Sequence, residues 1–211
     1  MNKPSFDDPA GTWNRRFASA GFLFGTAPNR WLARHACSTA GWRAGQRVLS
    51  VADGEGRNSV WLAEQGLAVD AFDLAEAGVA KARRLAAGRG VRVNYAVADV
   101  DRLVWPPALY DGVAAIFVQF ADPTMRERLF AHIAHCLVPG GTLVLQGYTP
   151  RQLEYRTGGP PRADHLYTPQ MLRQAFAALE ILALDEYDDD LAEGEGHRGR
   201  SALVGLVARK R

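Results

Sequence analysis

Residues Arg47-Val48-Leu49-Ser50-Val51-Ala52-Asp53-Gly54-Glu55-Gly56 decide the fold class of this 211-residue chain. The stretch begins with apolar and β-branched residues, which predict a strand over 47–52. It ends in the turn Asp53-Gly54-Glu55-Gly56, and a helical pattern follows over 57–65 until Gly66, a typical C-cap residue. A strand that passes through a glycine-rich turn into a helix is the first unit of an α/β fold.

The same alternation continues along the chain. Helices are predicted over 75–87, 122–137 and 168–178, and strands over 68–72, 91–97, 111–117, 142–146, 180–184 and 201–208. Strands that alternate with helices predict right-handed crossovers and a mostly parallel, doubly wound sheet. No helix separates the last two strands, so we expect them to pair antiparallel, with the last one inserted beside the fifth.

Two polar stretches interrupt the pattern of strands and helices. Residues 148–167 are expected to form an insertion, and the acidic, glycine-rich residues 188–199 to connect the last two strands. The acidic run 185–190 is typical of a solvated edge.

Aromatic side chains are frequent before the first strand, at Trp13, Phe17, Phe22, Phe24 and Trp31. This content is too high for a flexible tail. We therefore expect residues 1–45 to form a helical flap over the top of the sheet. Residues 46–211 would complete a single Rossmann-like domain spanning 1–211, because one domain commonly extends to about 200–250 residues.

Composition argues against several classes of partner. The net charge is only +2 and the arginines are scattered, so neither nucleic acid nor a membrane is expected as a partner. Residues 1–11 lack the apolar region of a signal peptide, and the apolar stretch 113–121 is shorter than the about 20 residues that a membrane span needs. We therefore expect a cytoplasmic protein.

Metal binding and disulfide stabilisation are not expected. Cys37 and Cys136 leave one disulfide open by counting, but they do not suggest a disulfide scaffold. His132, His135 and Cys136 have spacings that suit a metal site, yet the same spacings suit a half-buried helix face, and no third group of ligands accompanies them.

The crevice after the first strand is the expected ligand site, because ligands of open α/β sheets bind at the carboxyl ends of strands where the strand order reverses. Gly54 and Gly56 permit a tight turn and close approach of the backbone. Asp73 ends the second strand, where a carboxylate can accept hydrogen bonds from both ribose hydroxyls or, alternatively, cap the next helix. Ser59 stands where the dinucleotide fingerprint requires a third glycine, which argues against a nicotinamide cofactor.

Other features fall at matching strand ends. Ala98-Asp99-Val100 follows the third strand, where Asp99 can read an adenine amino group or simply form a turn. Tyr110-Asp111 introduces the fourth strand, and Leu137-x-Pro139-Gly140-Gly141 precedes the fifth. Together these features are more specific than the glycine turn alone.

The combination resembles a class I S-adenosylmethionine-dependent methyltransferase over roughly residues 12–208. Within that superfamily it resembles the small tellurite-resistance and thiopurine methyltransferase-like group, on four segments: Trp13-Asn14-Arg15-Arg16-Phe17, Phe24-Gly25-Thr26-Ala27-Pro28-Asn29, Gly54-Glu55-Gly56-Arg57-Asn58 and Thr157-Gly158-Gly159-Pro160. The resemblance implies a seven-stranded sheet of order 3-2-1-4-5-7-6 and an N-terminal segment folded over the cofactor. The cofactor implied is S-adenosyl-L-methionine, which leaves S-adenosyl-L-homocysteine as product.

The chain departs from common members of this group in its first strand and turn. Ser50 replaces an Asp, and Ala52-Asp53-Gly54 replaces Gly-Cys-Gly. We hypothesise that the acid at Asp53 takes over a contact to the methionine ammonium group; the alternative is a turn residue without a ligand.

The predicted cofactor residues come from the turn, the strand ends and the aromatic segment: Trp13, Arg16, Phe24, Gly25, Asp53, Gly54, Glu55, Gly56, Arg57, Asn58, Asp73, Leu74, Ala98, Asp99, Val100 and Phe117. The predicted substrate residues lie near the mouth of the crevice: Phe17, Gln119, Phe120, Tyr148, Tyr155, Arg156 and His197. The aromatic residues of the flap could instead serve core packing, Arg16 could lie in solvent, and Gln119 could only satisfy the backbone.

Methyl transfer from a sulfonium is an in-line displacement, so the protein mainly orients the reactants and excludes water. The five histidines are dispersed, and the sequence shows no catalytic pair. We predict an enzyme, a monomer or homodimer, that methylates a small-molecule nucleophile such as a thiol or a chalcogen compound. The alternatives are an N- or O-methyltransferase of a natural product and a non-catalytic cofactor-binding regulatory protein.

Overall fold

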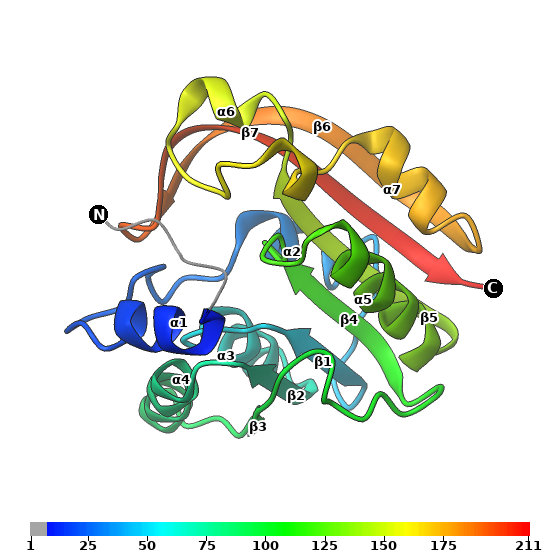
Figure 1. Cartoon of the computed structure of the whole chain (residues 1–211). Helices are drawn as coiled ribbons and strands as arrows, with labels where there is room; N and C mark the ends of the chain where they lie inside the picture. The colour runs from blue at the N-terminus through cyan, green and yellow to red at the C-terminus, as the bar shows by residue number, and fades with distance from the viewer. Residues whose placement is uncertain (1–7) are drawn as a thin grey trace.

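A computed structural model describes residues 8–211 of the chain (Figure 1). Its strands are β1 (Arg47–Val51), β2 (Ala68–Asp73), β3 (Asn94–Val97), β4 (Tyr110–Ile116), β5 (Leu137–Tyr148), β6 (Leu179–Glu193) and β7 (His197–Lys210). Its helices are α1 (Pro9–Phe17), α2 (Arg30–His35), α3 (Arg57–Glu64), α4 (Glu76–Gly88), α5 (Pro123–Cys136), α6 (Gln152–Tyr155), the 3₁₀ helix η1 (Ala163–His165) and α7 (Pro169–Ala175).

The seven strands form one sheet in the order β3-β2-β1-β4-β5-β7-β6. Strands β1 to β5 pair in parallel, whereas β7 runs antiparallel to both β5 and β6. The strand order reverses between β1 and β4, so the crevice at their carboxyl ends is the place where such a sheet binds a ligand. The predicted fold class, strand order and antiparallel last strand are confirmed.

Helices cover both faces of the sheet, as the apolar character of the central strands requires. On one face, Leu129 and Ile133 of α5 and Leu172 of α7 pack on side chains of β1, β4 and β5. On the other face, Leu32 of α2 and Leu62 of α3 belong to a second core cluster. Residues 8–211 contain no helix with the length and apolarity to cross a membrane.

The terminal hairpin is much longer than expected, and the prediction of a connecting stretch over 188–199 is wrong. Strand β6 continues to Glu193 and β7 already begins at His197, so only a short turn joins them. Most residues of β6 are half-buried or exposed, and the strand carries a run of aspartates, as is typical of an edge strand. Charged side chains protect such a strand from pairing with another chain. The arched hairpin carries its turn to the vicinity of the N-terminal segment (Figure 1).

The predicted flap over 1–45 divides into two parts, and its first seven residues lie outside the described chain. Helix α1 lies against α4 and belongs to the segment over the carboxyl ends of the strands. Helix α2 is instead a core helix, because Trp31 and Leu32 are buried against the sheet. Asn29 marks the boundary between the two parts, because its side chain caps the start of α2 by accepting a hydrogen bond from the Leu32 amide.

Candidate cofactor and acceptor site

The turn after β1 has a backbone that only small residues tolerate. Gly54 and Gly56 have φ values of 61° and 93°, and a Cβ on Gly56 would lie 2.7 Å from the Cα of Ala82 in α4. Ala52 also has a positive φ, of 49°, as does Phe117 at the end of β4, with 56°. Left-handed conformations of non-glycine residues are costly and gather at functional sites. Here they mark the ends of the two strands between which the order reverses.

Asp73 braces this turn from the end of β2. Its Oδ2 accepts the amide of Gly54 at 2.9 Å and its Oδ1 accepts the amide of Ala75 at 2.8 Å. Burial raises the pKa of Asp73, although these two amide hydrogen bonds oppose the shift. Each carboxylate oxygen has a second lone pair, so the group keeps the capacity to accept hydroxyl groups of a ligand.

Asp53 is held by two serines. Its carboxylate accepts the hydroxyl of Ser50 at 2.7 Å, the amide of Ser59 at 3.2 Å and the hydroxyl of Ser59. Burial raises the pKa of Asp53 to about 6, and the serine hydrogen bonds counteract that rise. The Asp53 carboxylate therefore lies at the N-terminal end of α3 and forms its hydrogen bonds within the turn. The hypothesis of an ammonium contact remains a prediction, and Ser59 now has a role in place of the missing glycine.

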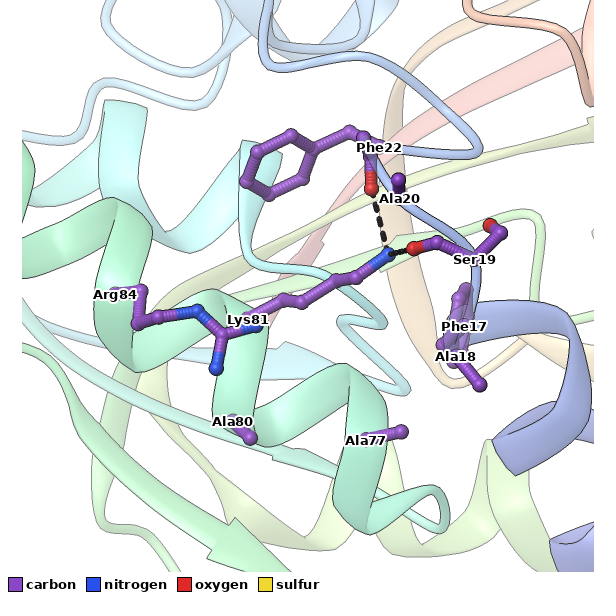
Figure 2. A pocket seen from close by; sticks show the side chains of 10 residues that line it. Phe17, Ala18, Ser19, Ala20, Phe22, Ala77, Ala80, Lys81 and Arg84 are labelled. Carbon is purple, nitrogen blue, oxygen red and sulfur yellow. Dashed lines mark hydrogen bonds between the residues drawn. The ribbon is translucent and has the colours of Figure 1, made fainter.

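Glu55 and Lys81 fasten the N-terminal segment to the turn. The two form a buried ion pair of 2.7 Å, and the other carboxylate oxygen of Glu55 accepts the amide of Leu23. The Lys81 ammonium also donates to the carbonyls of Ser19 and Gly21, reaching from α4 to the chain that follows α1 (Figure 2). A groove of about 560 Å³ lies between this chain and α4. These contacts place the segment after α1 beside the glycine turn.

Aromatic rings of the N-terminal segment lie over the same turn. A Cβ on Gly54 would lie 3.3 Å from the ring of Phe17, which stacks on Trp13 and meets the edge of Phe24. The Arg16 guanidinium lies 4.4 Å from the centre of the Trp13 ring, and burial lowers its pKa. Arg16 is thus partly buried against aromatic rings, and Gly25 lies next to Gly194 of the hairpin turn.

A buried polar cluster occupies the centre of the crevice. Arg57 of α3 forms an ion pair of 2.8 Å with Glu193, whose carboxylate also lies 3.6 Å from Nδ1 of His197. Burial alone would raise the pKa of Glu193, but His197 and Arg57 outweigh it and lower the pKa to about 2. The cluster therefore holds a charged carboxylate next to an imidazole.

Two amide side chains connect this polar cluster to the strands. The Asn29 side chain donates to Gln146 of β5 at 2.6 Å and to Glu193 at 3.1 Å, while the Asn29 amide donates to Asn58. Sequence reasoning missed Asn29, Gln146 and Glu193. The signal in the sequence is the spacing of Glu193 and His197 across a turn with two glycines, but the acidic composition before that turn favours a loop.

His197 lies between two aromatic rings that were predicted to bind the cofactor. Its ring centre is 4.4 Å from that of Phe24 and 4.3 Å from that of Phe117. Tyr148 at the end of β5 packs on Phe117 at 4.7 Å. The structure thus brings together Phe24, Phe117, Tyr148 and His197, which come from four distant parts of the sequence.

Phe17 meets this cluster at Phe24, but the remaining predicted substrate residues do not join it. Gln119 bridges backbone groups, because it donates to the carbonyls of Tyr148 and His165 and accepts the Tyr148 amide. The Tyr155 hydroxyl donates to Asp188 on β6, Arg156 is exposed, and Phe120 packs against the core. Their assignment to the acceptor has no support from these positions.

The adenine end of the predicted site is built mainly by backbone. Asp99 accepts the amide of Asp101 in a turn, and Val100 is buried in the core. The amide of Ala98 donates to the carbonyl of Asp73, which joins the ends of β2 and β3. Leu74 is half-buried beside them.

The residues of the crevice fit a ligand that carries hydroxyl groups and a charged amino-acid portion. The glycine turn allows close approach, and Asp73 can accept hydroxyl groups. Arg57, Glu193 and His197 add a buried guanidinium, a carboxylate and an imidazole, which are the groups that interact with a charged amino-acid portion.

Metal ligands and a disulfide are not found in the part of the chain that the structure describes. Among residues 8–211 no three His, Cys, Asp or Glu side chains are grouped to hold a metal ion. His132 stacks on Trp105, and the thiol of Cys136 donates to the carbonyl of Ile133. Both cysteines are free, with Cys37 exposed and Cys136 buried.

Comparison with known proteins identifies the same region. Residues 48–141 match the family described as "Methyltransferase domain". The chain is 34% identical over 125 residues to a demethylmenaquinone methyltransferase of Thermus thermophilus, covering 57% of this chain and 55% of that protein. It is 29% identical over 156 residues to a ubiquinone biosynthesis O-methyltransferase of Methylocella silvestris, covering 67% of this chain and 60% of the other. The chain thus spans little more than half the length of these relatives.

A solved structure matches almost the whole chain. Its description concerns the conversion of a disulfide bond into a thioacetal group during echinomycin biosynthesis. The match has a TM-score of 0.76 at 18% identity and covers 95% of this chain and 92% of the other. This similarity supports the fold. Residues 48–141 thus match a methyltransferase domain, and the fold of the chain is also that of a solved structure described as SAM-dependent methyltransferases from Methanosarcina mazei, with a TM-score of 0.70 at 16% identity over 87% of this chain and 98% of the other.

Proposed function

We propose that the protein transfers the methyl group of S-adenosylmethionine to a small-molecule nucleophile. The observation that carries the proposal is the glycine turn after β1, braced by Asp73 and facing the buried cluster of Arg57, Glu193 and His197. The cofactor, when bound, supplies an electrophilic methyl group on a sulfonium, so the protein's work is binding, orientation and exclusion of water.

The described residues divide this work between the two ends of the crevice. Asp73 would accept the ribose hydroxyls, and the backbone from Ala98 to Val100 would border the adenine. Arg57 would bind the carboxylate of the amino-acid portion, since a buried guanidinium is a strong partner for a carboxylate. Phe17 and Phe24 would cover both ligands and exclude water from the transfer.

For the acceptor we propose a small thiol or chalcogen compound, as in the tellurite-resistance and thiopurine methyltransferase-like group that the sequence resembles. The description of one solved structure of the same fold, which concerns a disulfide and a thioacetal, is consistent with sulfur as the acceptor atom. An oxygen acceptor is the second candidate, because one relative is named an O-methyltransferase and because an imidazole lies in the crevice. We propose that the protein is a monomer or homodimer in the cytoplasm. We propose neither a nucleic acid nor a membrane as its partner.

The test is a turnover assay with the whole chain. The protein is incubated with S-adenosylmethionine and separate panels of thiols, selenite, tellurite and phenols, and S-adenosylhomocysteine is measured. We expect product with one small-molecule panel. Cofactor binding without product from any panel would favour a regulatory role, and binding of NADH in place of S-adenosylhomocysteine would contradict the assignment.

A further inference from the structure

The β6–β7 turn places an acid and an imidazole together in the crevice, and this pair has no role so far in the transfer of the methyl group. Glu193 ends β6 and His197 begins β7, so the short turn between them aligns their side chains. Both side chains are buried, and the ring of His197 is packed between Phe24 and Phe117. Phe117 follows β4, next to the point at which the strand order reverses. The imidazole therefore lies at the ligand end of the sheet.

We propose that His197 is the general base that removes a proton from the acceptor and that Glu193 is the residue that positions it. The proposal rests on the methyltransferase function and deepens it, because it assigns the acceptor to nucleophiles that carry a proton. Thiols and phenols share this chemistry, whereas selenite and tellurite are already anions.

Geometry favours the tautomer that a base requires. Nδ1 of His197 faces Oε2 of Glu193 at 3.6 Å, and the same oxygen is held by Nη1 of Arg57 at 2.8 Å. Catalytic hydrogen bonds are often long without a ligand and tighten when one binds. A carboxylate at Nδ1 fixes the proton on that nitrogen and leaves the lone pair of Nε2 for the acceptor.

Burial and two nearby arginines keep the His197 ring neutral. Burial lowers the pKa of His197, and Arg57 from α3 and Arg16 from α1 act in the same direction. Glu193 from β6 opposes them. From β5 the ring faces Tyr148, and burial raises the pKa of that phenol, so Tyr148 stays uncharged. A neutral imidazole near pH 7 is the form that accepts a proton.

The reaction balances without a further reactant. The bond between the acceptor atom and its hydrogen breaks, and the proton moves to Nε2 of His197. The electron pair left on the acceptor forms the new bond to the methyl carbon, while the electrons of the sulfonium–methyl bond remain on sulfur as a neutral thioether. The imidazolium then returns its proton to solvent.

The first test is a pH–rate profile of the whole chain with two protonated acceptors and one anion: a cysteine-type thiol with a pKa of about 8.5, a 4-alkylphenol with a pKa of about 10, and selenite. His197→Gln should lower kcat for the thiol or the phenol by about 10²–10⁴-fold. The remaining rate should rise with pH as the acceptor ionises by itself. Glu193→Gln should lower kcat less and shift the profile, and His135→Gln, at an exposed histidine of α5, should change nothing.

The two acceptors distinguish sulfur from oxygen, and S-adenosylhomocysteine affinity separates this proposal from the proposed function. A His197→Gln variant that binds S-adenosylhomocysteine like wild type, yet keeps its kcat and pH profile on thiol and phenol, overturns the assignment. Turnover of selenite alone also overturns it. A wild-type protein that does not bind S-adenosylhomocysteine contradicts the proposed function, and the role of His197 then fails with it.

A second readout does not depend on turnover. Nitrogen-15 NMR of the histidine rings, with His197 assigned by the His197→Gln spectrum, should show a neutral ring at pH 7 with its proton on Nδ1. A charged ring at pH 7, or a proton on Nε2, would overturn the proposal.

Discussion

At Asp53, burial and hydrogen bonding act in opposite directions on one carboxylate. Its oxygens accept from Ser50 and Ser59, yet burial still raises its pKa from 3.8 to about 6. Between about pH 4 and pH 6 the folded state therefore binds more protons than the unfolded state. By linkage, this group lowers the free energy of unfolding as the pH rises through that window, by about 3 kcal/mol in total.

The Asp53→Asn variant should remove that pH dependence. An amide can accept from one serine and donate to the other, so the hydrogen bonds can be kept without a buried charge. We expect the variant to gain stability relative to wild type between pH 4.5 and pH 7, measured by urea unfolding at both values. Asp190→Asn, at an exposed aspartate of β6, is the control and should leave the shape of the curve unchanged. Equal pH dependence of wild type and Asp53→Asn would contradict this view of Asp53.

Single residues also set the limit of sequence reasoning at the site. The known spacing of a glycine turn and a strand-end acid predicts that Asp73 lies beside Gly54, and the structure brings the two together; that they bind the cofactor stays a prediction. Gln119 was assigned to the acceptor from its place after β4, but its amide instead satisfies three backbone groups of β5 and the insertion. No sequence pattern distinguishes these two uses of an amide.

The β6–β7 hairpin is the element that completes the crevice. Its turn contacts the N-terminal segment, because the Gly196 amide donates to the carbonyl of Leu23 at 3.0 Å. A Cβ on Gly194 would lie 2.4 Å from the Leu23 carbonyl oxygen and 2.5 Å from the Gly25 amide nitrogen. Close packing of backbone on backbone therefore joins the two segments that surround His197.

Gly194→Ala should separate these segments. Gly194 and Gly90 have nearly equal φ values, of +70° and +69°, but a Cβ on Gly90 would meet nothing within 4 Å. Gly90→Ala thus measures only the left-handed strain of about 1 kcal/mol. We expect Gly194→Ala to lower the melting temperature further and to expose residues 18–25 to limited proteolysis. Equal behaviour of the two variants would show that the contact between hairpin and N-terminal segment is unimportant.

The clearest wrong prediction from the sequence concerns this hairpin, where a connecting loop was expected in place of two long strands. The acidic run from Asp185 to Asp190 gives β6 a composition that is typical of a loop. The glycines that follow it give residues up to 199 a loop-like composition as well. An edge strand tolerates these charges because one of its sides faces solvent. The pairing with β7, which decides the matter, is a tertiary interaction that local composition does not encode.

For the whole molecule, the alternation of strands and helices was sufficient to predict the sheet. The parallel strands β1, β4 and β5 are buried on both faces and therefore read as apolar runs. The strand order came from the family resemblance. The polar cluster could not be predicted, because its members are distant in sequence and meet only through tertiary contacts: Asn29, Arg57, Gln146 and Glu193.

The central claim is that the crevice after β1 binds the cofactor, and isothermal titration calorimetry with S-adenosylhomocysteine tests it most directly. We predict one bound molecule per chain and at least about tenfold weaker binding, or about 1.4 kcal/mol, for Asp73→Ala. Asp70→Ala is the matched control, since Asp70 lies on the same strand but pairs with Arg47 and Asn94; it should bind like wild type. Absence of binding by wild type, or an Asp73→Ala variant with unchanged affinity, would contradict the account.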